Sequence, residues 1–214
     1  MRKPVLTIKE RSLSYKFMAA EAFWILSGSD MVADIAPWNS RIANFSDDGE
    51  RFFGAYGPKI TSQLPYVVEK LKSDKDSRQA GLTIWRETPP ATKDVPCTVA
   101  VFANIRNELL NISVFMRSSD AWLGLPYDVF NFSMLGHLIC AHVGNLQPGC
   151  LYLTAFSSHL YESNFVDALA CSTVPSAEVY KMTPPELYKD PEALMERLKA
   201  LRDSRPGEPI RWWE

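Results

Sequence analysis

The sequence predicts one domain that combines α-helices with β-strands. Two stretches, 13–27 and 127–143, carry apolar residues in patterns typical of helices, and residues 99–116 hold two strand-like stretches joined by a turn. The chain has 214 residues, an ordinary length for one large domain. We therefore expect a single domain over residues 1–214, since no repeat or linker divides it.

The first part of the chain is expected to form two helices around a long loop. Leu13, Phe17 and Trp24 recur at helical spacings, so a helix is predicted over 13–27. Residues 29–58 are rich in Asp, Ser, Asn, Gly and Pro, which predicts a long ordered loop of the kind that is usually functional. A second helix is predicted over 60–72.

The rest of the chain is expected to form a sheet and two more helices. The predicted strands are 82–85, 99–105, 110–116 and 150–156, the middle two forming a hairpin with one buried face and a turn at 106–108. The stretch 127–143 is apolar nearly all round, as in a helix buried in the middle of a fold. A last helix follows the N-cap Asp190, with an apolar stripe of Leu194, Leu198 and Leu201.

Composition excludes several classes of protein. Apolar residues make up 46% of the chain and charged residues 22%, which excludes disordered and low-complexity proteins. The net charge of −2 offers no positive field to a nucleic-acid backbone, so dedicated DNA or RNA binding is disfavoured. Trp212-Trp213 could stack on bases, but no basic stripe surrounds the pair in the sequence, so ordinary packing of the two side chains is favoured. The most apolar stretch, 129–143, is shorter than the roughly 18 to 20 residues of a membrane helix.

The cysteines bear on location and metals. Cys97, Cys140, Cys150 and Cys171 form no C-x-x-C pair and have no zinc-type spacing with the three histidines, so no metal site is expected. The N-terminus lacks a secretory signal. These features favour a reducing cytoplasm, although an even number of cysteines leaves disulfides open.

Glu21 and Cys97 are the first candidates for chemistry. Glu21 lies on the apolar stripe of its helix, where desolvation would raise its pKa into the range of a general acid or base; a partly exposed Glu at the edge of the stripe is the alternative. Cys97 opens a strand, and Arg117 ends the partner strand of the same hairpin. A nearby arginine would lower the pKa of the thiol and make it a nucleophile, whereas an isolated cysteine usually only packs.

Three further residues allow two interpretations each. Asp128 lies near the start of the helix at 127–143, where a carboxylate often caps the helix. His159 and Tyr161 are two apart on an extended segment, so they face one side and can bind a sugar or phosphate together, or simply form a surface pair. Residue types alone also allow a Cys-His hydrolase that uses Cys97 with one of the three histidines, His137, His142 or His159, although Arg117 and Asp128 would then be unexplained.

Six segments of the chain form a set of motifs in a fixed order. They are Glu21-Ala-Phe-Trp-Ile-Leu26, Gly54-Ala-Tyr-Gly57, Asp76-Ser-Arg78, Pro96-Cys97, Arg117-Ser-Ser-Asp120 with Leu123-Gly-Leu-Pro-Tyr127, and Ser158-His-Leu-Tyr161. Together and in this order they resemble the motifs of the thymidylate synthase superfamily. Thr98 stands where the family usually has a histidine after the nucleophile. The resemblance implies an α+β fold in which a bent mixed β-sheet packs with helices, and an obligate homodimer formed through a face of that sheet. It also implies 5,10-methylenetetrahydrofolate as co-substrate and a pyrimidine nucleoside monophosphate as substrate.

The resemblance assigns roles to individual residues. Cys97 would add to C6 of the pyrimidine, with Glu21 and Tyr56 assisting proton transfer. The remaining roles belong to binding. Arg117 and Ser118, with Arg78 from the other subunit, would hold the phosphate; His159 and Tyr161 would meet the sugar hydroxyl; Asp120, with Leu123 and Gly124, would meet the folate.

One departure from the family pattern concerns the choice of base. Asp128 stands where thymidylate synthases carry an Asn that both donates to O4 and accepts from N3–H of uracil. A carboxylate only accepts, which fits the N4 amino group of cytosine. This exchange resembles the phage-type deoxycytidylate (dCMP) hydroxymethylases, in which water captures the intermediate. Residues 41–45 replace a loop Trp that keeps water out, and Trp38 is out of register with it.

The sequence therefore predicts a deoxycytidylate 5-hydroxymethyltransferase, acting in the host cytoplasm if a phage encodes it. The enzyme alternatives are a dUMP methylase or hydroxymethylase and a CMP hydroxymethylase. A degenerate family member that binds a nucleotide or RNA as a regulator is the non-enzyme alternative. The family's N-terminal phosphate-binding arginine loop has no counterpart here, which leaves Arg2 or Arg11 as substitutes.

Overall fold

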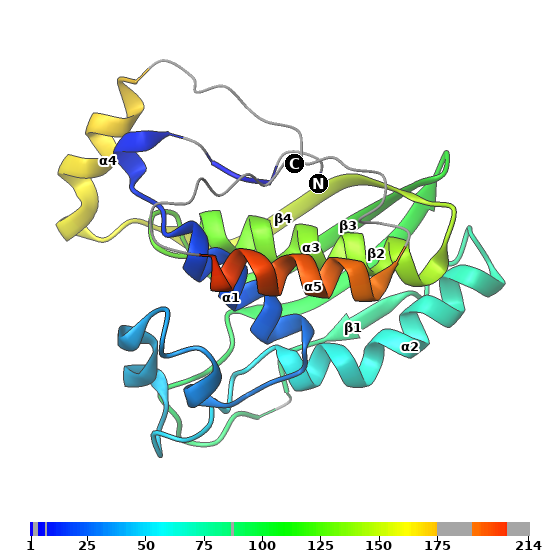
Figure 1. The fold of residues 1–214 in the computed structure, drawn as a ribbon, viewed down its shortest axis with the longest axis horizontal. Coiled ribbons are helices and arrows are strands. Elements are labelled where there is room, and N and C mark those ends of the chain that lie inside the picture. Colours follow the sequence, from blue (N-terminus) through cyan, green and yellow to red (C-terminus); the bar gives the residue numbers. More distant parts are fainter. Residues whose placement is uncertain (2–3, 7, 87, 175–189, 205–214) are drawn as a thin grey trace.

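A computed structural model describes the chain except for residues 2–3, 7, 87, 175–189 and 205–214 (Figure 1). Arg2 and the Trp212-Trp213 pair lie outside the described residues. The α-helices are α1 (Tyr15–Leu26), α2 (Gly57–Ser73), α3 (Leu125–Val143), α4 (Phe165–Ser172) and α5 (Pro191–Asp203). The strands are β1 (Gly81–Thr83), β2 (Thr98–Arg106), β3 (Leu109–Asp120) and β4 (Gln147–His159).

The four strands form one mixed sheet in the order β1-β2-β3-β4. β1, β2 and β3 are antiparallel neighbours, whereas β4 runs parallel to β3. The β2–β3 hairpin turns through Asn107 and Glu108, whose φ angles of 53° and 60° are those of a tight two-residue turn. Parallel strands need a crossover, and α3 supplies it between β3 and β4. The predicted α+β fold with a mixed sheet is confirmed.

Helices cover one face of this sheet. α3 packs against β3 and β4 and against α1, α2 and α5, and Figure 1 shows α3 and α5 running side by side across the strands. Phe130, Phe132 and Leu135 of α3 are almost fully buried, as its all-round apolar pattern predicts. In α5, Asp190 accepts a hydrogen bond from the Glu192 N–H at 2.9 Å, and the predicted leucine stripe is buried.

The opposite face of the sheet is open in the single chain. It exposes large apolar side chains on three neighbouring strands: Phe102 of β2, Phe115 of β3, and Tyr152 and Phe156 of β4. Phe156 is 93% exposed. A patch of this kind on a sheet is typical of a protein–protein interface.

Several element bounds differ from those predicted. β3 continues to Asp120, because Ser118 and Asp120 pair with Ser157 and His159 of an equally extended β4. The polar cluster that starts at Arg117 therefore lies within a strand instead of following one. The predicted ordered loop at 29–58 contains two short 3-10 helices, Val32–Asp34 and Ser40–Phe45. The sequence analysis did not predict α4.

None of the helices in the described part of the chain is long and apolar enough to cross a membrane.

Candidate active site

A cavity of about 160 Å³ opens between α1, the loop at 29–58 and the start of α3. Its polar lining consists of Glu21, Tyr56, Asp94, Asp128 and Asn131. Its apolar lining consists of Trp24, Ile25, Ile42, Phe45, Phe52 and Ala55. Gly54 also lines the cavity. Most of the predicted catalytic groups therefore share one small space.

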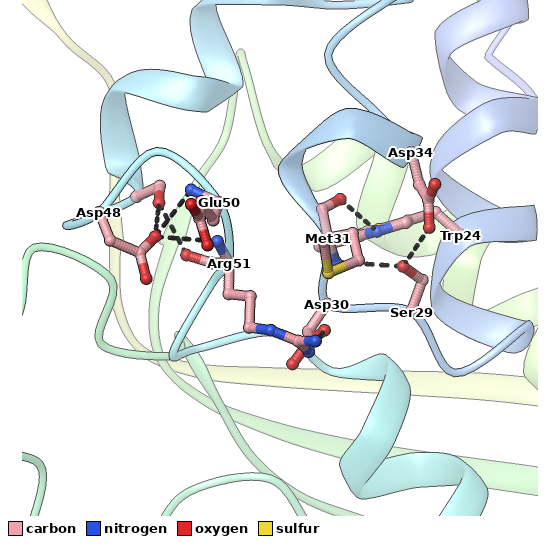
Figure 2. Close-up of polar contacts among 9 residues, drawn as sticks. Trp24, Ser29, Asp30, Met31, Asp34, Asp48, Glu50 and Arg51 are labelled. Carbon is pink, nitrogen blue, oxygen red and sulfur yellow. Dashed lines mark hydrogen bonds and ion pairs between the residues drawn. The ribbon is translucent and has the colours of Figure 1, made fainter.

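Polar contacts fix the loop that forms one wall of this cavity (Figure 2). The Asp48 carboxylate accepts hydrogen bonds from the N–H groups of Glu50 and Arg51 at 2.7 and 2.9 Å. Arg51 in turn forms an ion pair with Asp30 at 2.6 Å. At the end of α1, the Trp24 indole donates to the Met31 carbonyl at 3.2 Å. The loop is thus tied both to itself and to the helix that carries Glu21.

Glu21 lies in the cavity wall, on the inward side of α1. Its carboxylate accepts a hydrogen bond of 2.8 Å from the Asn131 amide of α3. Burial raises the pKa of Glu21 to about 7, and the Asn131 bond partly opposes that rise. Glu21 lines the cavity and keeps partial exposure, so its position combines features of both interpretations. A pKa close to neutrality suits a group that must both give and take a proton.

Asp128 faces Glu21 from the first turn of α3. The N-cap of α3 is Gly124 and Asp128 is the fourth residue of the helix, so Asp128 lies in the first turn but does not occupy the capping position. Burial raises the pKa of Asp128 well above its usual value, and the nearby charges of Glu21 and Asp120 raise it further. Two carboxyl groups that share a small cavity hold a proton more tightly than either would alone.

Tyr56 closes the cavity on the side of β2. Its hydroxyl accepts hydrogen bonds from the N–H and the hydroxyl of Thr98, both at 3.1 Å, and its ring stacks on Phe132. Burial and the charge of Asp128 raise the pKa of Tyr56, which keeps the phenol neutral. Gly54 allows the chain before Tyr56 to pass close to Asp94, since a Cβ at position 54 would lie 2.4 Å from the Asp94 carbonyl oxygen.

Cys97 directly precedes β2 and is half-buried. Arg117 is its neighbour, as predicted: the Arg117 N–H donates to the Cys97 carbonyl at 2.8 Å, and the guanidinium donates to the carbonyls of Val95 and Pro96. Arg117 lowers the pKa of the thiol, as expected, but other influences outweigh it, so the net pKa is raised. Burial raises the pKa of Cys97, Arg117 opposes that rise, and Asp128 and Asp94 add to it.

The predicted sugar and phosphate residues meet at the ends of two parallel strands. Ser118 Oγ lies 3.4 Å from His159 Nδ1, and the rings of His159 and Tyr161 make an edge-to-face contact with centroids 5.1 Å apart. Both strands end at the same edge of the sheet, a common place for ligands in sheets of this kind. The structure thus brings Ser118, His159 and Tyr161 together.

The predicted folate residues form a turn beside Asp128. Asp120 Oδ1 accepts hydrogen bonds from the N–H groups of Trp122 and Leu123, and the Gly124 N–H donates to the Asp120 carbonyl. The Leu123 side chain is 55% exposed. Nearby, Arg11 stacks on the Trp122 ring, 4.3 Å from its centroid, and donates to the Trp122 carbonyl.

Arg78 lies far from this group within one chain. It precedes β1, whose Gly81 pairs with Phe102, and Arg106 at the same end of β2 forms an ion pair with Asp76. Cys97 lies at the opposite end of β2, a strand of nine residues. About 25 Å of strand therefore separates Cys97 from the end of the sheet near Arg78. The Arg78 of one chain therefore cannot reach the Cys97 of the same chain.

Asn131 is one of two polar residues of the cavity that sequence reasoning missed. It interrupts an apolar helix three residues after Asp128, and this spacing puts both side chains on one helical face. That spacing was the available signal. Asp94 was also missed, because nothing in the sequence links its loop to Gly54, whose N–H donates to it at 2.6 Å.

Comparisons with known proteins agree on one family. Residues 1–182 match the family model described as thymidylate synthase. The chain is 27% identical to a deoxyuridylate hydroxymethyltransferase of Bacillus phage SP01 over 93% of this chain and 55% of that protein. It is 30% identical to one of Pseudomonas phage M6 over 74% of this chain and 48% of that protein. The chain thus spans about half the length of these curated relatives.

Solved structures give the same fold. The thymidylate synthase of T4 phage superposes with a TM-score of 0.71 at 22% identity, covering 87% of this chain and 75% of that one. Thymidylate synthase A of Bacillus subtilis also gives a TM-score of 0.71 at 22% identity, covering 83% and 68%. With the family model matching most of the sequence, these likenesses lead to one conclusion: the chain belongs to the thymidylate synthase family.

Proposed function

We propose that this chain transfers a one-carbon unit from a folate to C5 of a pyrimidine nucleotide and leaves it there as a hydroxymethyl group. Membership of the thymidylate synthase family supports the reaction class. The curated phage relatives named deoxyuridylate hydroxymethyltransferases support the hydroxymethyl product and make dUMP the favoured substrate.

The observation that carries the choice of base is the placement of Asp128 beside Glu21 in one cavity. As an anion, Asp128 would only accept hydrogen bonds and would repel O4 of uracil, which is the argument that favours cytosine. The raised pKa changes this argument, because a neutral carboxyl group has one donor and one acceptor. It then offers uracil the same pair of groups as the amide of an Asn.

The second candidate substrate is dCMP, which the identity of residue 128 favours. A neutral carboxyl group can turn so that its carbonyl accepts from N4 of cytosine while its hydroxyl donates to N3. An ionised Asp128 would keep only the first of these bonds. The ratio of the two activities therefore depends on the protonation of Asp128, and CMP remains an alternative because the sugar contacts do not fix the 2′ position.

The residues of the cavity divide the chemistry among them. The thiolate of Cys97 attacks C6 of the pyrimidine, which makes C5 nucleophilic. The folate supplies the one-carbon unit when bound, and the exposed Leu123 and the buried, unpartnered Oδ1 of Asn131 leave contacts open for a ligand in the described part of the chain. Glu21 accepts and returns protons near O4, and the neutral hydroxyl of Tyr56 assists it. For the transfer to balance, C5 would bond to the one-carbon unit and lose its proton, tetrahydrofolate would leave, and water would supply the hydroxyl group. Release of Cys97 then frees the product.

The cavity wall supports capture by water. Ile42 and Phe45 form the wall at the place where the family has a Trp, and Phe45 is 58% exposed. Trp38 turns away toward α5, where its indole donates to the Arg202 carbonyl at 3.3 Å. Trp38 is not among the residues that line the cavity, which supports access of water to the reacting carbon.

A homodimer would complete the phosphate site. The open face of the sheet provides an apolar surface for a second copy, and Arg78 is too far from Cys97 to serve its own chain. In the proposed dimer, Arg78 of the other subunit joins Arg117 and Ser118 at the phosphate. His159 and Tyr161 hold the sugar.

Product analysis tests the proposal. Purified protein is incubated with 5,10-methylenetetrahydrofolate and an equimolar mixture of dUMP, dCMP and CMP, and the nucleotides are identified by mass spectrometry. We expect hydroxymethylated dUMP in excess, with Cys97→Ser as the inactive control. Methylated dUMP would contradict water capture, and hydroxymethylated dCMP alone would reverse the choice of base. Absence of every product would favour a binding role.

A further inference from the structure

We propose that Asn131 is a positioning residue that decides which of two acidic side chains in the cavity keeps a shared proton. It holds the negative charge on Glu21 and thereby leaves the proton on Asp128. The inference rests on the proposed function, in which Asp128 contacts the pyrimidine. It names Asn131 as the residue that sets the protonation state of Asp128.

The geometry places Asn131 between the two acids. It follows Asp128 by three residues on α3, so both side chains lie on the same face of the helix. From there its amide donates to Glu21 Oε2 at 2.8 Å. Asn131 is only 6% exposed, and all three residues line the same cavity. A donor that is both short-range and buried acts on Glu21 with little competition from water.

The two acids differ in what surrounds them. Glu21 receives a charge-assisted hydrogen bond, which favours its ionised form. Within the described residues no hydrogen bond is donated to the Asp128 carboxyl group, and the charges that act on it, Glu21 from α1 and Asp120 from β3, are negative. The first proton to leave the pair therefore comes from Glu21, and the resulting anion makes ionisation of Asp128 harder.

The other titratable groups of the cavity do not reverse this order. Asp94, from the loop before β2, adds negative charge on the same side. Tyr56 stays neutral, and Cys97 is neutral before it reacts. The positive charge of Arg117 is directed to Cys97 and to the carbonyls of Val95 and Pro96.

Infrared spectroscopy of the free protein reads the position of the proton directly. At a pH above the pKa of Glu21, which is about 7, the protein should show a carboxylic-acid carbonyl band that is lost in Asp128→Asn and kept in Glu21→Gln. In Asn131→Leu, which keeps the branched shape of the side chain in a somewhat larger volume but removes the donor, the assignment should reverse. Asn131→Ser retains a donor in a smaller side chain and should keep the wild-type assignment.

Turnover gives a second readout. One hydrogen bond to a charged group shifts a pKa by about one unit or more, so Asn131→Leu should lower the ratio of kcat/KM for dUMP to that for dCMP about tenfold at neutral pH. Asn131→Ser should stay near the wild-type ratio. In wild type the ratio of kcat/KM for dUMP to that for dCMP should fall as the pH rises and Asp128 ionises. In Asn131→Leu this fall should occur at a lower pH.

Each outcome decides the question. A wild-type band that belongs to Glu21 would overturn the proposal, and so would an Asn131→Leu variant that keeps the wild-type assignment, because the donor would then have no effect on the position of the proton. If the wild type converts neither nucleotide, the proposed function fails, but the infrared assignment still tests the role of Asn131. If Asn131→Leu does not fold, the wild-type and Ser assignments remain decisive.

Discussion

The hydroxyl of Tyr56 accepts hydrogen bonds from both the backbone N–H and the hydroxyl of Thr98, each at 3.1 Å. These bonds join the N-terminal end of α2 to the first residue of β2, directly after Cys97. The contact therefore fixes the distance between the nucleophile and the wall of the cavity that carries Glu21 and Asp128.

Removing this contact should affect stability and turnover together. Tyr56→Phe leaves the buried Thr98 N–H without its acceptor, which costs about 1 to 3 kcal/mol. Thr98→Val removes only the hydroxyl and keeps the N–H bond, so it is the milder control. Chemical denaturation measures both variants. Equal losses in the two would contradict the role assigned to the backbone bond.

The pH dependence of stability should show the burial of Glu21. A carboxyl group with a raised pKa binds its proton more tightly when the protein is folded, so its contribution to stability is complete below the unfolded pKa and is lost as the pH rises. For Glu21 that window runs from its usual value of 4.5 to about 7, with a loss of at most about 3 kcal/mol in the free energy of unfolding.

The matched variant is Glu21→Gln, which cannot ionise. Denaturation of wild type and variant is compared at several pH values, because the difference between the two curves removes contributions from other groups. The variant should gain stability relative to wild type as the pH rises through this window. A difference that does not change with pH would contradict the placement of Glu21.

The reactivity of Cys97 should depend on Arg117. Because Arg117 is the positive charge that opposes the raised pKa of the thiol, Arg117→Gln should raise that pKa further. The rate of alkylation by iodoacetamide, followed against pH, should move to higher pH in the variant. Cys150 is exposed, so Cys150→Ser serves as the background for both proteins. An unchanged profile would show that Arg117 only positions the loop.

Mixing inactive variants tests whether a site is shared between subunits. Cys97→Ser and Arg78→Ala are each expected to be inactive or weak as homodimers. A mixed dimer would contain one site with both Cys97 and Arg78 intact, so random exchange should restore about a quarter of wild-type activity. No recovery after confirmed subunit exchange would contradict the contribution of Arg78 across the dimer.

The open face of the sheet can be tested separately. Phe156→Asp places a charge on a side chain that is 93% exposed in the single chain, so the fold should persist while the dimer dissociates. Sedimentation gives the mass, and circular dichroism checks the fold. Lys75→Asp, on the exposed surface near the hairpin turn, is the control. A variant that remains dimeric would place the interface elsewhere.

Local patterns of the sequence predicted most of the fold and part of the site. The apolar run of α3, the alternation of β2 and β3 and the Asp190 cap depend on neighbours in the chain, so they could be read directly. The extension of β3 to Asp120 depends on pairing with β4, which no local pattern encodes. The pKa of Cys97 was mispredicted for a similar reason, because burial and the carboxylates of Asp94 and Asp128 are set by tertiary structure.

The crossover from β3 through α3 to β4 places two groups of candidate site residues on different kinds of element. The end of β3 and the end of β4 carry Ser118 and His159, which are held in register by the sheet. The first turns of α3 carry Asp128 and Asn131, which are held by the helix. Under the proposed function, substitutions on that helical face would change which base is accepted without disturbing the strand ends proposed to bind the rest of the nucleotide, and proteins with this fold would then diverge in substrate by exchanging very few residues.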